Sequence, residues 1–167
     1  YQDLLPFHFD DSNQYAYALL RSQSIDNYGL YKLDISTLAL TEIYQPDQVD
    51  LIPSDAIFDT NGQLVGITER DSTFEYHYFN DDSDTVRWHK MLTRAFKGQI
   101  VRFTSFTDDG KAALVMVGSD KNPGGFYFFD TESKRADYLF SRAEWLTPDD
   151  LAPVKPITYQ ASDGLVI

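Results

Sequence analysis

The chain has 167 residues, of which 43% are hydrophobic and 24% charged, a composition that indicates a folded globular domain rather than a disordered one. Its net charge is −12, because 26 acidic residues outnumber 14 basic ones, which are scattered along the sequence. Nucleic acids and anionic membranes need clustered Lys and Arg, so both classes of partner are excluded. The absence of cysteine excludes disulfides, thiolate chemistry and Cys-ligated zinc.

The first quarter of the chain predicts an antiparallel meander. FDDSNQYAYALL, which starts at Phe9, contains an aromatic strand end, a polar turn with Ser-Asn at 12–13, and an alternating apolar strand. A later strand ends at Asp34, whose short polar neighbours are expected to close a turn by bonding to backbone amides. With a last strand over 38–44, these features predict four short strands within residues 3–44.

The same pattern then returns twice. FDTNGQLVGIT starts at Phe58 and FTDDGKAALVMV at Phe106, 49 and 48 residues after the preceding copy. Their Asn-Gly and Asp-Gly turns supply residues that tolerate the positive φ of tight hairpins. Asp130 repeats the turn aspartate of the first copy at an offset of 96 residues, and last strands are expected over 85–91 and 135–140.

Four short strands in roughly 48 residues are typical of a β-propeller blade. The predicted fold class is all-β: a partial β-propeller of about three four-stranded antiparallel blades, at about 3–44, 50–91 and 99–140, plus a C-terminal linker. Because propellers typically have about 4–8 blades, we expect this chain to be part of a larger protein. Its end blades would expose faces through which such a fragment could self-associate.

Residues 141–167 break the period. Thr-Pro-Asp-Asp at 147–150 predicts a helix start with a capping hydroxyl and a proline in the first turn. Pro153 and Pro156 are expected to end that helix early and to begin a linker. ITYQASDGLVI then predicts a strand, an Asp-Gly turn and the beginning of a second strand.

This tail resembles the junction in prolyl oligopeptidase-family serine peptidases, where the last propeller blade meets the α/β-hydrolase domain. GSDKNPGGFYFFDTES (118–133) resembles the blade before that junction, and the dipeptidyl- and acylaminoacyl-peptidase branch is the nearest match. The resemblance covers residues 98–167, and residues 1–97 share only the generic blade pattern. Many members carry Arg where this chain has Ser162. The matching elements of the tail are Leu151-Ala152-Pro153, Pro156-Ile157, Tyr159, Ala161, Asp163-Gly164-Leu165 and Ile167.

The resemblance implies a non-catalytic propeller segment of a serine peptidase or related hydrolase, gating the access of short peptides to the active site. The catalytic Ser, Asp and His would lie downstream of residue 167. The implied partners are the α/β-hydrolase domain of the same parent chain and a peptide substrate. The family's propeller can also lend Arg or Glu to hold a substrate terminus. Glu69 and Arg70, just after a predicted strand, are the substrate-binding candidates, and the alternative is solvent-facing loop charge.

The residues themselves predict no catalytic centre within the chain. The nucleophile motif G-x-S-x-G does not occur. His8, His77 and His89 are interpreted as packed or surface residues of strands rather than as bases. NDDSD at 80–84 begins like an EF-hand loop but lacks the Gly and Glu needed at the sixth and twelfth positions. We therefore expect no catalytic residue, metal or cofactor here.

A self-standing β-propeller that binds or scaffolds a partner is the alternative function. ITYQASDGLVI would then be the inner hairpin of a fourth blade, although its Asp163-Gly164 turn follows Asp109-Gly110 by 54 rather than 48 residues. The sequence leaves the compartment open, because a cysteine-free chain is compatible with the bacterial cytoplasm and with the periplasm. No apolar stretch reaches the roughly 18 residues of a membrane span.

Overall fold

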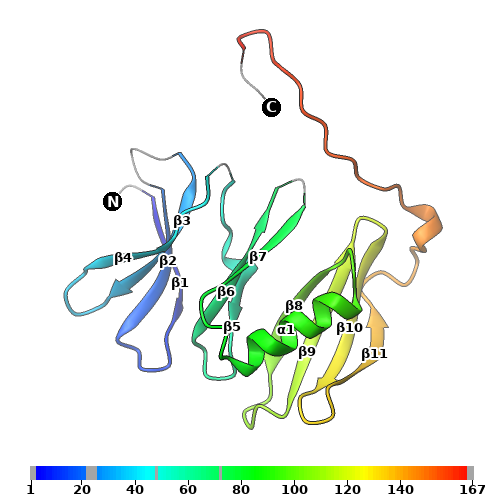
Figure 1. The fold of residues 1–167 in the computed structure, drawn as a ribbon, viewed down its shortest axis with the longest axis horizontal. Coiled ribbons are helices and arrows are strands. Elements are labelled where there is room, and N and C mark those ends of the chain that lie inside the picture. The colour runs from blue at the N-terminus through cyan, green and yellow to red at the C-terminus, as the bar shows by residue number, and fades with distance from the viewer. Residues whose placement is uncertain (1–2, 22–25, 48, 72, 165–167) are drawn as a thin grey trace.

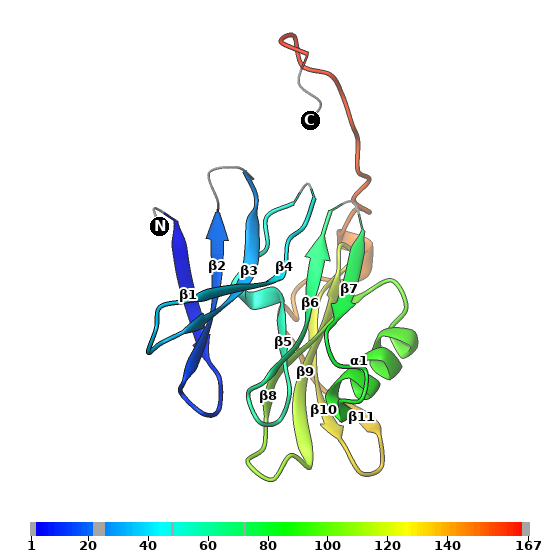
Figure 2. The ribbon, with the colours of Figure 1, turned by 60° about the vertical axis from the view of Figure 1, so that its left-hand side comes forward.

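The computed structural model describes residues 3–21, 26–47, 49–71 and 73–164 of the chain. Three antiparallel sheets follow one another along the sequence and lie side by side (Figures 1 and 2). The first sheet is ordered β1-β2-β3-β4, with bounds Leu4–Phe9, Tyr15–Arg21, Tyr28–Asp34 and Leu40–Tyr44. The second is β5-β6-β7, with bounds Ala56–Phe58, Leu64–Arg70 and Phe74–Tyr78. The third is β11-β10-β9-β8, whose strands in chain order are Ile100–Phe106, Ala112–Ser119, Asn122–Asp130 and Arg135–Ser141.

Helical structure in the described part of the chain is confined to α1 (Asp84–Ala95) and the 3-10 turns η1 (Pro53–Asp55) and η2 (Pro148–Asp150). The predicted all-β class is confirmed, since the remaining regular structure is antiparallel sheet in which consecutive strands pair. No helix in the described ranges is long and apolar enough to span a bilayer.

The three predicted hairpins are confirmed together with their turn chemistry. A residue with positive φ stands in each turn: Asn13 at 56°, Gly62 at 72° and Gly110 at 66°. In the turns after β3 and β10, a carboxylate accepts bonds from backbone amides as predicted. Asp34 accepts from Ser36 and Thr37 at 2.8 and 2.9 Å, and Asp130 accepts from Ser133 at 2.7 Å. Each turn is therefore fixed by local side chains.

The prediction of a strand over 85–91 is wrong, because these residues lie in α1. Val86, His89 and Leu92 recur at helical spacing on the buried face of this segment. Ser83 at the N-cap and Asp84 in the first turn favour a helix start. The second sheet therefore has three strands, and α1 follows β7 where the other two sheets place a fourth strand.

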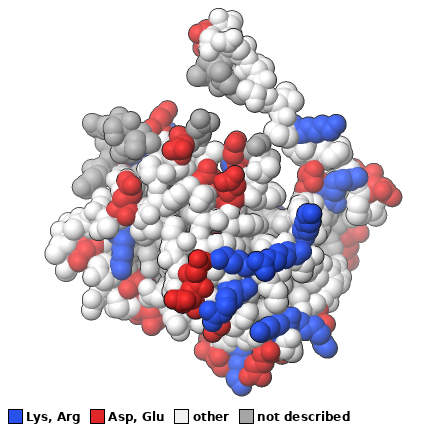
Figure 3. Space-filling view, viewed as in Figure 1, with Lys and Arg blue, Asp and Glu red and all other residues white. Residues whose placement is uncertain are grey.

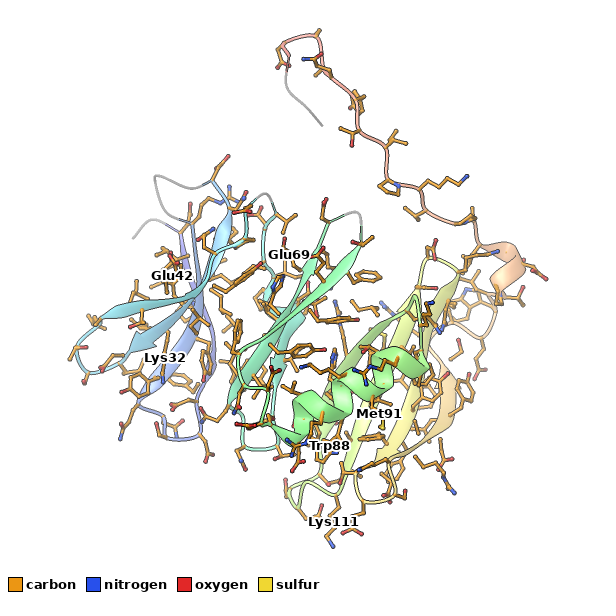
Figure 4. All side chains as sticks on the ribbon, in the orientation of Figure 1. Lys32, Glu42, Glu69, Trp88, Met91 and Lys111 are labelled. Carbon is orange, nitrogen blue, oxygen red and sulfur yellow. The ribbon has the colours of Figure 1, made fainter. Side chains whose placement is uncertain are left out.

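The core consists of contacts between neighbouring layers. Leu19 and Leu30 of the first sheet pack with Leu51 and with Ile67 of the second. Trp88 and Met91 project from α1 (Figure 4), and they pack with Leu92 against a third-sheet cluster centred on the fully buried Phe129. The helix thus packs against both the second and the third sheet.

The tail after β11 turns once and then extends. The Asp150 carboxylate accepts bonds from the Thr147 amide and hydroxyl at 2.8 and 2.9 Å, so the predicted helix start is reduced to the single turn η2. Residues 151–159 have no regular secondary structure and lead away from the third sheet (Figure 1). The Asp-Gly turn ends at Gly164, whose amide bonds to the Ala161 carbonyl at 2.9 Å. The second strand predicted after it falls on 165–167, outside the described residues.

Candidate functional site

An open groove of about 960 Å³ lies between the second and third sheets. Its walls come from the β6–β7 turn and the first half of β7, the end of α1, the β9–β10 turn and the extended tail. The space-filling view shows a hollow beneath that tail (Figure 3). The lining residues are Asp71, Thr73, Phe74, Tyr76, Thr93, Gly98, Gln99, Ser119, Asp120, Val154, Pro156, Ile157 and Thr158.

The groove combines an aromatic wall with two carboxylates. Phe74, whose exposed fraction is 41%, and Tyr76 supply the rings, while Asp71 and Asp120 supply the charge. The Asp120 carboxylate also accepts a 2.7 Å bond from the Val154 amide, which holds the tail beside the groove. No Lys or Arg belongs to the described lining. A concave apolar surface with a few polar groups is the usual form of a ligand site.

Glu69 lies outside this groove, at the junction of the first and second sheets (Figure 4). The sequence predicts Glu69 and Arg70 in a loop just after a strand. In the structure they are the last two residues of β6. The Tyr44 hydroxyl donates to the Glu69 carboxylate, and Nε2 of His77 lies 3.3 Å from the same carboxylate. Burial and Glu69 raise the pKa of Tyr44, which keeps its hydroxyl protonated as the donor.

Arg70 belongs to a different cluster, because successive strand residues point to opposite faces. Its guanidinium donates through Nε at 3.0 Å, and through Nη2, to the buried carboxylate of Asp55. Arg102 of β8 donates to the same carboxylate oxygen. Burial raises the pKa of Asp55 to about 6 against the lowering effect of Arg70, so the carboxylate is ionised at neutral pH. This cluster ties the second sheet to the third.

The three histidines make structural contacts. The His8 ring in β1 lies 3.9 Å from the Phe58 ring, and His77 in β7 stacks on Tyr44 at 4.5 Å between ring centroids. His89 lies in α1 rather than in the predicted strand, and it is completely buried. Among the described residues, no histidine hydrogen-bonds to a serine hydroxyl, which is the contact that a Ser-His pair requires.

The proton positions on His89 follow from its two partners. Nε2 lies 3.0 Å from the Val101 carbonyl, which can only accept, so Nε2 carries the hydrogen. Nδ1 therefore accepts from the Tyr78 hydroxyl at 2.8 Å. Burial lowers the pKa of His89 to about 4, so the ring is neutral at pH 7. Its role is to join α1 to β7 and β8.

Metal binding has no evident site in the part of the chain that the structure describes. No group of three or more His, Cys, Asp or Glu side chains is arranged to hold an ion there. In the acidic 80–84 segment, Asp81 and Asp84 instead pair with Lys90 and Arg87 of α1. These contacts anchor the start of the helix.

A likeness to known proteins is found among solved structures. No family model matches the chain, and no curated protein matches it. Among solved structures, the crystal structure of TolB from Acinetobacter baumannii aligns with a TM-score of 0.48 and 14% sequence identity. The alignment covers 98% of this chain and 42% of that chain, so the chain spans less than half the length of that structure.

Proposed function

We propose that this chain forms three consecutive blades of a β-propeller in a serine peptidase of the prolyl oligopeptidase family. In this proposal it is a non-catalytic gate, and the catalytic serine, acid and histidine are carried by an α/β-hydrolase domain downstream of residue 167. The observation that carries the proposal is the extended tail that follows the third sheet. It combines the junction-like sequence with an unusual exposure of apolar side chains.

The tail has the character of a segment that packs on another domain. Val154, Ile157 and Tyr159 are exposed by 76%, 79% and 55% along one extended stretch. Exposed apolar side chains that gather in one short segment commonly mark an interaction surface rather than a solvated loop. They fall within the sequence that resembles the propeller–hydrolase junction, which supports a hydrolase domain as their partner.

The repeated packing of the sheets supports further blades. Leu30 of the first sheet is fully buried in the layer shared with the second sheet. Its counterpart 96 residues later, Phe126, contacts Phe140 across β10 and β11 at 5.1 Å between ring centroids. On the same face of the third sheet, Phe128 is 42% exposed. A further sheet packed there would bury this face as the second sheet buries that of the first.

A gate of this kind works through size. A ring of rigid sheets admits short or extended peptides and excludes folded proteins. It also helps to shield the active site from bulk water. The chain itself would contribute walls and binding surface, whereas bond cleavage would depend on the hydrolase domain.

Hydrolysis of substrates of graded size tests the gate. We expect the full-length protein to cleave peptides of a few residues and to leave a folded protein with the same cleavage sequence in an exposed loop intact. The residue 1–167 chain, assayed in parallel, should cleave neither. Equal cleavage of the short peptide and the folded protein would contradict the gate, and hydrolysis by the isolated chain would contradict its non-catalytic role.

A second function, a binding propeller without catalytic partner, is favoured by the groove itself. The groove has aromatic and carboxylate lining residues, and no histidine belongs to its described lining. A full-length protein that binds peptides but hydrolyses none of them would support this second function over the first.

A further inference from the structure

We propose that the outer edge of β7 binds an extended peptide, which adds to the second sheet as a fourth strand inside the groove. The expected peptide alternates apolar side chains with at least one basic side chain. Binding of this kind needs no catalytic serine, so it stands independently of the peptidase proposal.

The edge is open because α1 replaces a strand. In the first and third sheets the third strand pairs with a fourth, β4 or β11. In the second sheet β7 is the last strand, and α1 packs mainly against β8 and β6. Among the described residues, no backbone bond joins β7 to any strand other than β6. An unpaired strand edge is a template for another extended chain.

The ladder with β6 shows which backbone groups face outward. The Phe79 amide donates to the Val65 carbonyl at 2.9 Å, and the Asp71 amide donates to the Thr73 carbonyl at 3.2 Å. Both pairs belong to the β6–β7 register, and in an antiparallel ladder the hydrogen-bonded pairs alternate. The backbone amides and carbonyls of the odd-numbered residues of β7 therefore point toward β6. The amides and carbonyls that point to the open edge are those of Phe74, Tyr76 and Tyr78.

The groove lies against the first half of this edge. Phe74 and Tyr76, which present outward backbone groups, are also lining residues of the groove. A volume of about 960 Å³ lies at the upper end of the range of small-ligand sites and leaves room for a short peptide. Main-chain bonds to β7 would supply affinity, and the lining side chains would supply selectivity.

Charge selects the kind of peptide. Asp71 and Asp120 line the groove, no described Lys or Arg does, and the whole chain carries −12. A basic side chain on the added strand would meet these carboxylates, while its apolar neighbours would contact Phe74 and Tyr76. The negative field would also speed the approach of a cationic peptide.

The first test compares three capped pentapeptides on the residue 1–167 chain by isothermal titration calorimetry. Acetyl-Thr-Val-Lys-Val-Thr-amide is expected to bind. The same peptide with every backbone amide N-methylated should lose binding, because it cannot pair with the edge. Replacing its Lys by Glu should weaken binding at least about tenfold, which is about 1.4 kcal/mol. Equal binding of the N-methylated peptide would overturn the proposal.

The second test changes the edge itself. Phe74→Pro removes an outward amide and breaks no ladder bond to β6, so the fold should persist. We expect Phe74→Pro to weaken the binding of acetyl-Thr-Val-Lys-Val-Thr-amide (the Lys peptide) at least about tenfold more than Phe74→Val does. Phe74→Val removes the ring and keeps the amide. Equal affinities for Phe74→Pro and Phe74→Val would contradict strand addition.

A second copy of this chain is the competing occupant. Light scattering over a wide concentration range distinguishes a second copy from a peptide as the occupant of the edge. Pairing of two β7 edges would give a dimer, and Phe74→Pro would abolish it. Such a dimer, unaffected by excess Lys peptide, would overturn the peptide proposal. A monomer that binds the Lys peptide would support it, whether or not the full-length protein proves to be a peptidase.

Discussion

Replacing Phe129 by Ala is expected to lower the free energy of unfolding by about 3–5 kcal/mol. Phe129 lies in β10, is completely buried, and contacts Trp88 of α1 and Phe103 of β8 at 6.0 and 6.3 Å between ring centroids. Truncation would remove the transfer free energy of the ring and leave a cavity where the helix meets the third sheet. The surrounding side chains cannot easily move in to fill this cavity, because they belong to three different elements.

Urea unfolding followed by circular dichroism measures this effect. Phe128→Ala is the matched control, since it makes the same Phe-to-Ala change at the neighbouring position of the same strand. Phe128 is 42% exposed on the opposite face, so we expect a loss below about 1 kcal/mol. Equal losses for the two variants would show that α1 does not dock on the third sheet as described.

Protonation of His89 is expected to destabilise the fold by about 3 kcal/mol between pH 7 and pH 4. Burial lowers the pKa of His89 from 6.5 to about 4 in the folded chain. Between these values the unfolded chain binds the additional proton, so the stability rises with pH. The contribution is fully present above the unfolded pKa and is lost as the pH falls toward the folded one.

The comparison with His89→Gln isolates this contribution. A glutamine can donate to the Val101 carbonyl and accept from the Tyr78 hydroxyl, and it does not titrate. Urea midpoints at several pH values between 7 and 4 should fall more steeply for the wild type than for the variant, because the carboxylates contribute equally to both. Parallel curves would show that His89 is not held neutral by burial.

The hairpins could be predicted from sequence because their determinants are local. Asn13 adopts the positive φ that Gly62 and Gly110 adopt in the other copies, and Asp34 and Asp130 bond to amides two or three residues away. The helix α1 was not predicted, because two sequence signals favoured a strand in its place. The segment TVRWHKM is rich in aromatic and β-branched residues that favour strands, and the repeat predicted a fourth strand there. The buried spacing of Val86, His89 and Leu92 was the contrary signal.

The candidate site was largely hidden from the sequence because distant segments form it. Its walls come from β7, α1, the β9–β10 turn and the tail, and no local pattern brings these together. Glu69 and Arg70 are adjacent in the chain, yet strand alternation sends one to Tyr44 and the other to Asp55. Neither lines the groove, whereas the next residue, Asp71, does.

Covalent labelling with a fluorophosphonate probe, which bonds to an activated serine, tests most directly whether this chain is a non-catalytic gate of a serine hydrolase. The full-length protein and the residue 1–167 chain are labelled in parallel, and the modified residue is mapped by mass spectrometry. We expect one labelled serine in the full-length protein, downstream of residue 167, and no label on the isolated chain. A label within residues 1–167, or none on either protein, would contradict a non-catalytic gate attached to a serine hydrolase.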